Sequence, residues 1–180
     1  MKSFPYRFLI VTFFVVLLDQ ITKILIRSKF ELYESIDVLG SFFRLTYVEN
    51  PGAAFSLSLG TDVFNRYFFS IIALVVTFLI IYLLKNARHF MDRLAYSMII
   101  GGAIGNMIDR VLLGAVTDFF DFKFFKFIFG LDRWPIFNIA DSSIVCATII
   151  LLYFTIFIER KLNIDITTDV DTNNEEKIDE

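Results

Sequence analysis

Cysteine, histidine and proline are scarce in this chain of 180 residues, which has one cysteine, one histidine and three prolines. The single cysteine, Cys146, has no partner for an intramolecular disulfide, and its place in an apolar run predicts a small buried thiol. Zinc sites draw mainly on His and Cys side chains, so one residue of each type argues against a catalytic zinc. We therefore expect neither redox chemistry nor a metal or other cofactor.

Charged residues are also sparse over most of the chain. Hydrophobic residues make up 56% of the sequence, phenylalanine occurs 23 times, and the mean hydropathy is +0.64. This composition argues against a water-soluble domain and predicts a membrane protein. The net charge of −3 conceals an acidic stretch at residues 163–180, which we expect to be a disordered cytoplasmic tail.

Four apolar segments are long enough to cross a bilayer, which takes about 20 helical residues. They span approximately residues 7–27, 64–84, 93–113 and 136–158. The first is expected to be a retained helix rather than a cleaved signal peptide, because no cleavage site of small residues follows Leu18. The connection 85–93 is short and basic, with Lys85, Arg88 and Arg93, which predicts that it and both termini are cytoplasmic.

The two remaining connections then face outward. Residues 28–62 contain two alternating stretches, 41–49 and 54–59, which predict strands joined by a turn at residues 49–52. Residues 114–135 are rich in Phe and carry Trp134, so we expect them to lie along the membrane surface. The predicted fold is an all-α membrane protein with four transmembrane helices and a small extracytoplasmic β-sheet, in one domain of residues 1–162.

This topology brings polar residues from distant segments to one depth. A charged side chain at mid-membrane costs about 2.5–3.5 kcal/mol on insertion scales, so each one suggests a site. Asp19 and Lys23 lie in the outer half of the first helix, and Asp118 follows the outer end of the third. The other members of this group are Asn106, Asp109, Arg110, Asn138 and Asp141.

Most of these residues also have a purely structural interpretation. Asp19 and Lys23 have the spacing of an i,i+4 ion pair. Arg110 has the position of a side chain that extends to lipid head groups, and Asp109 that of its salt-bridge partner. Other structural interpretations are helix packing for Gly101, Gly102 and Gly105, a simple turn for Asn50–Gly52, and a solvated position for Asp121. Asp118 and Asp141 have no Lys or Arg at helical spacing, so this explanation fails for them.

Two carboxylates in a site of low dielectric share one proton and act together as acid and base, which favours peptide hydrolysis. The same pair would also suit a proton-coupled or cation-coupled transporter. A Ser-Lys dyad of Lys23 with Ser56 or Ser142 stays open, as does a lipid-binding assembly factor. A Ser-His or Cys-His nucleophile lacks its base, because His89 lies in the predicted cytoplasmic loop.

Five sequence motifs resemble the bacterial lipoprotein signal peptidase family, the type II signal peptidases. In chain order they are DQITK (19–23), NPGAAFS (50–56), GGAIGNMIDR (101–110), GAVTDF (114–119) and FNIADSSI (137–144). The resemblance implies four membrane helices with a β-cradle and a membrane-surface helix, in the bacterial cytoplasmic (inner) membrane with the active site at its outer face.

The resemblance also implies an aspartyl endopeptidase that cleaves diacylglyceryl-modified prolipoproteins before the lipidated cysteine and is inhibited by globomycin. The catalytic pair falls on Asp118 and Asp141. We expect a monomer that contacts membrane lipids and binds no nucleic acid. The supporting positions are Asp19, Lys23, Asn50, Gly52, Gly102, Gly105, Asn106, Arg110, Asn138 and Ala140.

Overall fold

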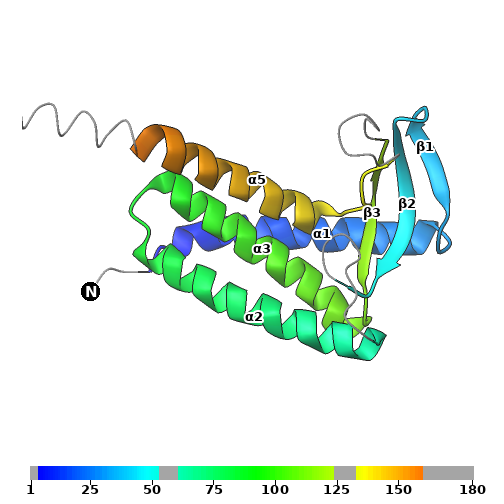
Figure 1. Cartoon of the computed structure of the whole chain (residues 1–180), viewed down its shortest axis with the longest axis horizontal. Helices are drawn as coiled ribbons and strands as arrows, with labels where there is room; N and C mark the ends of the chain where they lie inside the picture. The colour runs from blue at the N-terminus through cyan, green and yellow to red at the C-terminus, as the bar shows by residue number, and fades with distance from the viewer. Residues whose placement is uncertain (1–3, 53–60, 124–132, 160–180) are drawn as a thin grey trace, which may run out of the picture.

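The computed structural model describes residues 4–52, 61–123 and 133–159. Long helices run side by side, and a small sheet lies across one end of them (Figure 1). In chain order the elements are η1 (Tyr6–Phe8), α1 (Leu9–Lys29), β1 (Ser35–Leu39), β2 (Phe43–Asn50), α2 (Asp62–Asn86), α3 (Phe90–Leu112), β3 (Val116–Phe122), α5 (Ile139–Tyr153) and the π-helical turn η3 (Phe154–Glu159).

Each of the four predicted spans coincides with a helix to within a few residues. Within the described residues, three helical stretches are long and apolar enough to cross a membrane, namely Tyr6–Lys29, Val63–Asn86 and Ile139–Phe157. Helix α3 is not among them, because it carries charged residues at both ends and several glycines. A crossing by α3 therefore remains a prediction from the sequence.

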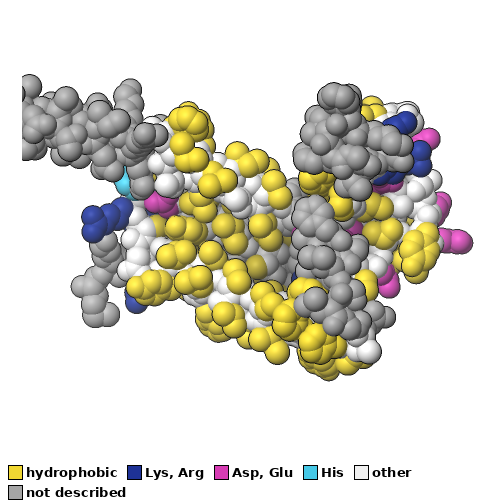
Figure 2. Space-filling model, viewed as in Figure 1, with side chains coloured by type: hydrophobic (Ala, Val, Ile, Leu, Met, Phe, Trp, Pro, Cys, Tyr) yellow, Lys and Arg dark blue, Asp and Glu magenta, His cyan; other side chains and the backbone are white. Residues whose placement is uncertain are grey.

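The helices present apolar side chains to their surroundings. Hydrophobic side chains are spread over the helical part of the molecule in Figure 2, and basic side chains are visible both at the end away from the sheet and at the sheet itself. Phe13, Ile71 and Phe78 are each more than half exposed, and a continuous apolar surface of this kind suits lipid rather than water. Cys146 is exposed as well. The prediction of a buried thiol was wrong, because an apolar run cannot distinguish the lipid-facing side of a helix from its packed side.

Helix α3 is the centre of the bundle and packs against α1, α2 and α5. Its glycines allow this close approach. A Cβ atom on Gly101 would lie 2.7 Å from Val15 Cβ of α1, and one on Gly102 would lie 2.5 Å from the Ala140 carbonyl oxygen of α5. A Cβ on Gly105 would lie 2.5 Å from Asp19 Oδ2. The packing interpretation of the three glycines is therefore confirmed, since small residues let helix backbones approach closely.

In the described part of the chain, the sheet has three antiparallel strands in the order β1-β2-β3. Strand β2 confirms the prediction for residues 41–49. The predicted turn at 49–52 is wrong in its first half, because Glu49 and Asn50 continue β2 and pair with Thr117 and Val116 of β3. The predicted strand 54–59 lies outside the described residues.

Strand β3 was not predicted. Residues 116–122 were expected to lie along the membrane surface, but they form the strand that joins the sheet to the helices; residues 124–132 lie outside the described part of the chain. The first four side chains of β3 are all buried, so the strand lacks the alternation of polar and apolar residues that reveals a half-exposed strand.

An apolar cluster fixes the sheet to the helices. Ile26 of α1, Tyr47 of β2 and Phe119 of β3 form its buried centre, and it extends to Phe30, Leu45, Phe120 and Ile139. Burial of a side chain of this size contributes about 1.5–3 kcal/mol. The cluster therefore holds the beginning of α5 and the middle of β3 against the end of α1.

Candidate active site

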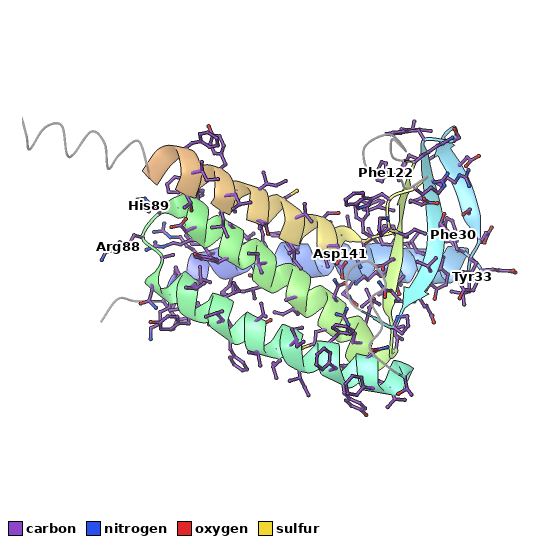
Figure 3. The ribbon with its side chains drawn as sticks, viewed as in Figure 1. Phe30, Tyr33, Arg88, His89, Phe122 and Asp141 are labelled. Carbon is purple, nitrogen blue, oxygen red and sulfur yellow. The ribbon has the colours of Figure 1, made fainter. Side chains whose placement is uncertain are left out.

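The candidate site lies where the sheet meets the ends of α1, α3 and α5. Figure 3 shows Asp141 at this junction, with Arg88 and His89 at the opposite end of the helices. His89 is thus remote from both candidate aspartates, and the exclusion of a histidine-dependent nucleophile at this site is supported.

Asp118 projects from β3 into the protein and is 2% exposed. Its Oδ1 accepts a hydrogen bond from Asn138 Nδ2 at 2.6 Å, and its Oδ2 accepts one from Asn50 Nδ2 at 3.1 Å. Burial and the neighbouring charge of Asp141 raise the pKa of Asp118 from 3.8 to about 7, although both hydrogen bonds lower it. Near neutral pH this carboxyl can therefore hold a proton and also release it.

Asp141 occupies the first turn of α5, where a capping box fixes it. The Asn138 side chain accepts from the Asp141 backbone N–H at 2.9 Å, and Asp141 Oδ2 accepts from the Asn138 backbone N–H at 3.3 Å. Asp141 Oδ1 accepts a further bond from Asn106 Nδ2 at 2.7 Å. A carboxylate in this position is stabilised by the N-terminal end of the helix.

Two asparagines connect the aspartates. Asn138 Nδ2 donates both to Asp118 Oδ1 and, at 3.0 Å, to Asn106 Oδ1, and Asn106 donates in turn to Asp141. The amide orientation of Asn106 follows from its neighbours. Its oxygen faces two groups that can only donate there, Lys23 Nζ at 2.9 Å and Asn138 Nδ2, so its nitrogen faces Asp141.

Lys23 is fully buried and supports this bridge from α1. Its ammonium group contacts Asp19 Oδ2 at 2.9 Å, Asp109 Oδ2 at 3.1 Å and Asn106 Oδ1 at 2.9 Å. The i,i+4 pair with Asp19 is confirmed, but it is one contact of three. All three N–H donors of the ammonium group are engaged, so the geometry does not support Lys23 as the free base of a Ser-Lys dyad.

Asp19 extends the same network to α5. Its Oδ1 accepts the Ala140 backbone N–H at 3.0 Å, and its Oδ2 bonds Lys23. A backbone donor in the first turn of α5 is thereby held by a carboxylate of α1. Asp19, Gly105 and Ala140 meet at this point, which explains why the carboxylate leaves no space for a side chain at position 105.

Arg110 lies 9% exposed at the end of α3. Its Nη2 donates to the Gly52 carbonyl at 3.1 Å, and the Gly52 N–H donates to Asn50 Oδ1 at 3.0 Å. The interpretation of Arg110 as a side chain extending to lipid head groups was wrong, because the guanidinium points inward to the backbone after β2. Asn50 and Gly52 are part of the site through these bonds and the contact of Asn50 with Asp118.

Sequence reasoning counted Asp109 among the converging polar residues but not among the supporting positions, and it did not consider Thr117. Asp109 is 1% exposed and pairs with Lys23, whereas the sequence had suggested Arg110 as its partner. Its Oδ2 also accepts the Thr117 backbone N–H at 3.0 Å. Thr117 precedes Asp118, so Asp109 fixes the backbone beside it. The helical i,i+3 spacing of Asn106 and Asp109 was the available signal, since it puts both on one face of α3.

Asp121 was predicted to be a solvated neighbour, and that prediction was wrong. It is 4% exposed, accepts from Arg133 Nη1 at 2.6 Å, and accepts from Thr46 Oγ1 at 2.9 Å. Its partners come from β2 and from the segment before α5, neither of which is near it in sequence. Among the described residues, no group of three or more His, Cys, Asp or Glu side chains is arranged to hold a metal ion.

Comparison with known proteins gives a consistent family. The family model for signal peptidase (SPase) II matches residues 11–157. The lipoprotein signal peptidase of Halothermothrix orenii is 42% identical over 146 residues, covering 81% of this chain and 92% of the relative. That of Haemophilus ducreyi is 39% identical over 166 residues, covering 91% of this chain and 99% of the relative.

Solved structures agree with the sequence comparison. A bacterial membrane enzyme solved by the in meso method at 1.9 Å has a TM-score of 0.72 and 35% identity, over 87% of this chain and 97% of that one. A second, at 2.3 Å, has a TM-score of 0.71 and 36% identity, over 86% and 93%. The match extends over the helices and strands that carry both aspartates, and the chain therefore belongs to the signal peptidase II family.

Proposed function

We propose that this protein is a membrane aspartyl endopeptidase that removes signal peptides from diacylglyceryl-modified prolipoproteins, cleaving before the lipidated cysteine. Asp118 and Asp141 are the catalytic residues. The observation that carries the proposal is the bridge between them, in which Asn138 bonds Asp118, Asn106 bonds Asp141, and the two asparagines bond each other.

In this mechanism the two carboxyl groups have different roles. The pKa of Asp118, raised to about 7, favours Asp118 as the holder of the shared proton at neutral pH. Asp141 then takes a proton from water, whose oxygen bonds the scissile carbonyl carbon, while Asp118 gives its proton to the carbonyl oxygen. Collapse breaks the C–N bond: Asp141 returns its proton to the leaving nitrogen, and Asp118 recovers one from the hydroxyl.

The supporting residues position these two groups. Asn106 and Asn138 orient the carboxyl groups, and Lys23 fixes the Asn106 amide. Asp19 holds the first turn of α5 through Ala140. Arg110 holds the backbone at Gly52, from which Asn50 reaches Asp118. Gly102 and Gly105 let α3 approach α5 and α1 closely enough for these bonds to form.

The proposed setting is the bacterial inner membrane, with residues 1–162 forming one domain. We propose that α3 completes a set of four spans, that both termini are cytoplasmic, and that the sheet and the aspartates lie at the outer face. The basic connection 85–93, whose Arg88 lies at the end of the helices away from the sheet (Figure 3), supports this orientation. At the outer face the scissile bond of a lipid-anchored substrate would lie at the depth of the aspartates.

The direct test is cleavage of a purified diacylglyceryl-modified prolipoprotein by the purified enzyme. Asp118→Asn and Asp141→Asn should each reduce turnover by at least about a thousandfold, because neither variant can both take and give the proton. Asp37→Asn is the matched control, since Asp37 lies on β1 and its side chain is 61% exposed. Full turnover by either catalytic variant would refute the assignment of the pair.

Three further measurements test the rest of the proposal. Unmodified prolipoprotein should be cleaved much more slowly than the diacylglyceryl form, and globomycin should inhibit cleavage. Mass measurement of the enzyme in detergent should give a monomer. Cleavage of both substrate forms at equal rates would contradict the requirement for the lipid.

A further inference from the structure

Asp121 is a buried carboxylate that the proposed mechanism does not use. Asp121 lies on β3 three residues after Asp118, and its side chain is 6% exposed. Arg133 Nη1 donates to Asp121 Oδ1 at 2.6 Å, and Thr46 Oγ1 donates to Oδ2 at 2.9 Å. The Arg133 side chain is 28% exposed, and its Nη2 also donates to the Ser41 carbonyl at 3.3 Å. The Asp121–Arg133 pair therefore joins β3, β2, the β1–β2 turn and the segment before α5.

Arg133 begins the segment that leads to α5. This segment runs along the free edge of β3, with Trp134 N–H donating to the Phe122 carbonyl at 2.9 Å. Phe137 and Phe120 exchange two backbone bonds, of 3.2 and 2.7 Å. Asn138 follows directly and reaches Asp118 Oδ1 at 2.6 Å. One short ladder thus connects the Asp121–Arg133 pair to the amide that bridges the two catalytic residues.

The register of this ladder determines where Asn138 points. Side chains alternate between the two faces of a strand, so a slip of one residue would turn Asn138 away from Asp118. Few backbone bonds hold residues 134–137 to β3, and the ladder contains one residue pair, Phe120 with Phe137. The ion pair supplies the charged, directional contact at the end of the ladder farthest from Asn138.

We propose that Asp121 and Arg133 are positioning residues for catalysis: their ion pair sets the register of residues 134–138 against β3 and so places Asn138 and Asp141 relative to Asp118. The inference rests on the proposed function, because it assumes that the bridged aspartates carry out the reaction. It assigns no direct contact with substrate to either residue of the pair.

The kinetic test uses Arg133→Gln, Asp121→Asn and the double variant in the prolipoprotein cleavage assay. Each single variant should lower kcat about tenfold and leave KM within about twofold, since a small misplacement of reacting groups affects turnover. The double variant should be no worse than the worse single variant, because both changes remove one interaction. Arg133→Lys keeps a positive donor and should recover part of kcat.

The matched control is Arg44→Gln. It removes the Asp37–Arg44 pair of the same sheet, which has an N···O distance of 2.8 Å but side chains that are 61% and 33% exposed. Arg44→Gln should leave kcat unchanged. The proposal would be overturned if the kcat losses of the two single variants multiplied in the double variant. It would also be overturned if Arg44→Gln lost as much kcat as Arg133→Gln.

The pH profile separates positioning from a general loss of folded enzyme. The hydrogen bond from Asn138 lowers the pKa of Asp118, so its loss in Arg133→Gln should raise that pKa and move the alkaline limb of the kcat profile to higher pH. A variant that is merely less folded should show the wild-type profile at reduced height. A profile reduced without displacement would therefore count against the proposal.

Hydrogen exchange tests the structural claim without the enzymatic assay. In Arg133→Gln the backbone amides of Trp134 and Phe137 should exchange faster, and amides at the middle of α3 should not change. If the wild-type protein shows no cleavage, the proposed function fails while this measurement still decides the register claim. If cleavage is normal and both amides keep their protection in Arg133→Gln, the register claim alone is refuted.

Discussion

Helices α1 and α2 are similar in length and apolar character, yet they differ in their buried polar groups. Helix α1 carries Asp19 and Lys23, both fully buried, and both bond to other elements of the site. Helix α2 packs chiefly on α3 and exposes most of its apolar surface. At the sheet end of α2, Arg66 Nη2 donates to the Val111 carbonyl at 2.5 Å.

Burial of a charged group costs free energy, and only α1 of these two helices carries buried ions at the candidate site. A buried ion is stabilised only when its partners satisfy it completely, and removal of one partner leaves the other in a poor environment. The site end of α1 depends on such partners, whereas the exposed face of α2 depends on apolar contact with its surroundings. Substitutions in α1 and α2 should therefore have very different effects.

The largest effect is expected from Lys23→Met. It leaves the buried carboxylates of Asp19 and Asp109 without their shared cation, a change that typically costs about 3–5 kcal/mol. We expect loss of both thermal stability in detergent and prolipoprotein cleavage. Lys29→Met is the matched control, because Lys29 is exposed in the last turn of the same helix. If Lys23→Met unfolded at the same temperature as the wild type, the contrast between α1 and α2 would be refuted.

The next effect concerns the pH dependence of stability. Burial raises the pKa of Asp118 from 3.8 to about 7, so between these values the folded protein binds a proton that the unfolded chain releases. The stability that the protonated Asp118 carboxyl contributes is fully present below a pH of about 3.8 and is lost as the pH rises to about 7. The difference in free energy of unfolding between Asp118→Asn and the wild type should therefore grow by a few kcal/mol in favour of the variant as the pH rises from about 4 to about 7.

Unfolding in detergent at several pH values, from about 4 to 8, measures this change. Asp37→Asn should follow the wild type throughout, because Asp37 is exposed on β1. A constant difference between Asp118→Asn and the wild type would show that the pKa of Asp118 is not raised in the folded protein.

A moderate effect is expected from Gly102→Ala. The new Cβ would lie 2.5 Å from the Ala140 carbonyl oxygen, so the first turn of α5 must move and Asp141 moves with it. We expect kcat to fall about tenfold to a hundredfold, since a displacement near 1 Å can have that effect. Gly101→Ala clashes instead with Val15 of α1 and should reduce stability more than kcat. Equal kcat losses in both variants would contradict the link from Gly102 to Asp141.

The smallest effect is expected on α2. Phe78 is 63% exposed on the apolar surface of the helix, and Phe78→Leu keeps that surface apolar. Cleavage activity should stay within about twofold of the wild type, because substitutions away from special contacts are usually mild. A large loss would indicate that this face of α2 contacts a specific partner, and would sharpen the comparison by giving α2 a role of its own.

The sequence predicted the parts of the fold that depend on apolar length. Each predicted span coincides with a helix, because a stretch of about 20 apolar residues has few alternatives to a helix in a membrane. The direction of each helix predicted that four polar residues would converge at one depth, namely Asp19, Lys23, Asn106 and Asp141. Their contacts agree with that prediction.

Other features depend on partners that sequence periodicity does not reveal. Strand β3 was missed because both of its faces are covered, and the burial of Asp121 was missed because Thr46 and Arg133 are distant in sequence. The orientation of the Asn106 amide likewise depends on three neighbours from two other segments, Lys23 of α1 and Asn138 and Asp141 at the start of α5. Motif similarity predicted Asn106 as a site residue but could not say which of its amide atoms faces Asp141.

Under the proposed function, the capping box of α5 makes helix initiation and assembly of the candidate active site a single event. Asn138 and Asp141 cap the helix with the same side chains that complete the bridge between the aspartates. A newly made chain whose last helix has not formed therefore lacks both Asp141 at the site and the Asn138 amide that bonds Asp118. Proteolytic capacity would arise only when the final segment is inserted, which would protect other membrane proteins from an incomplete enzyme during synthesis.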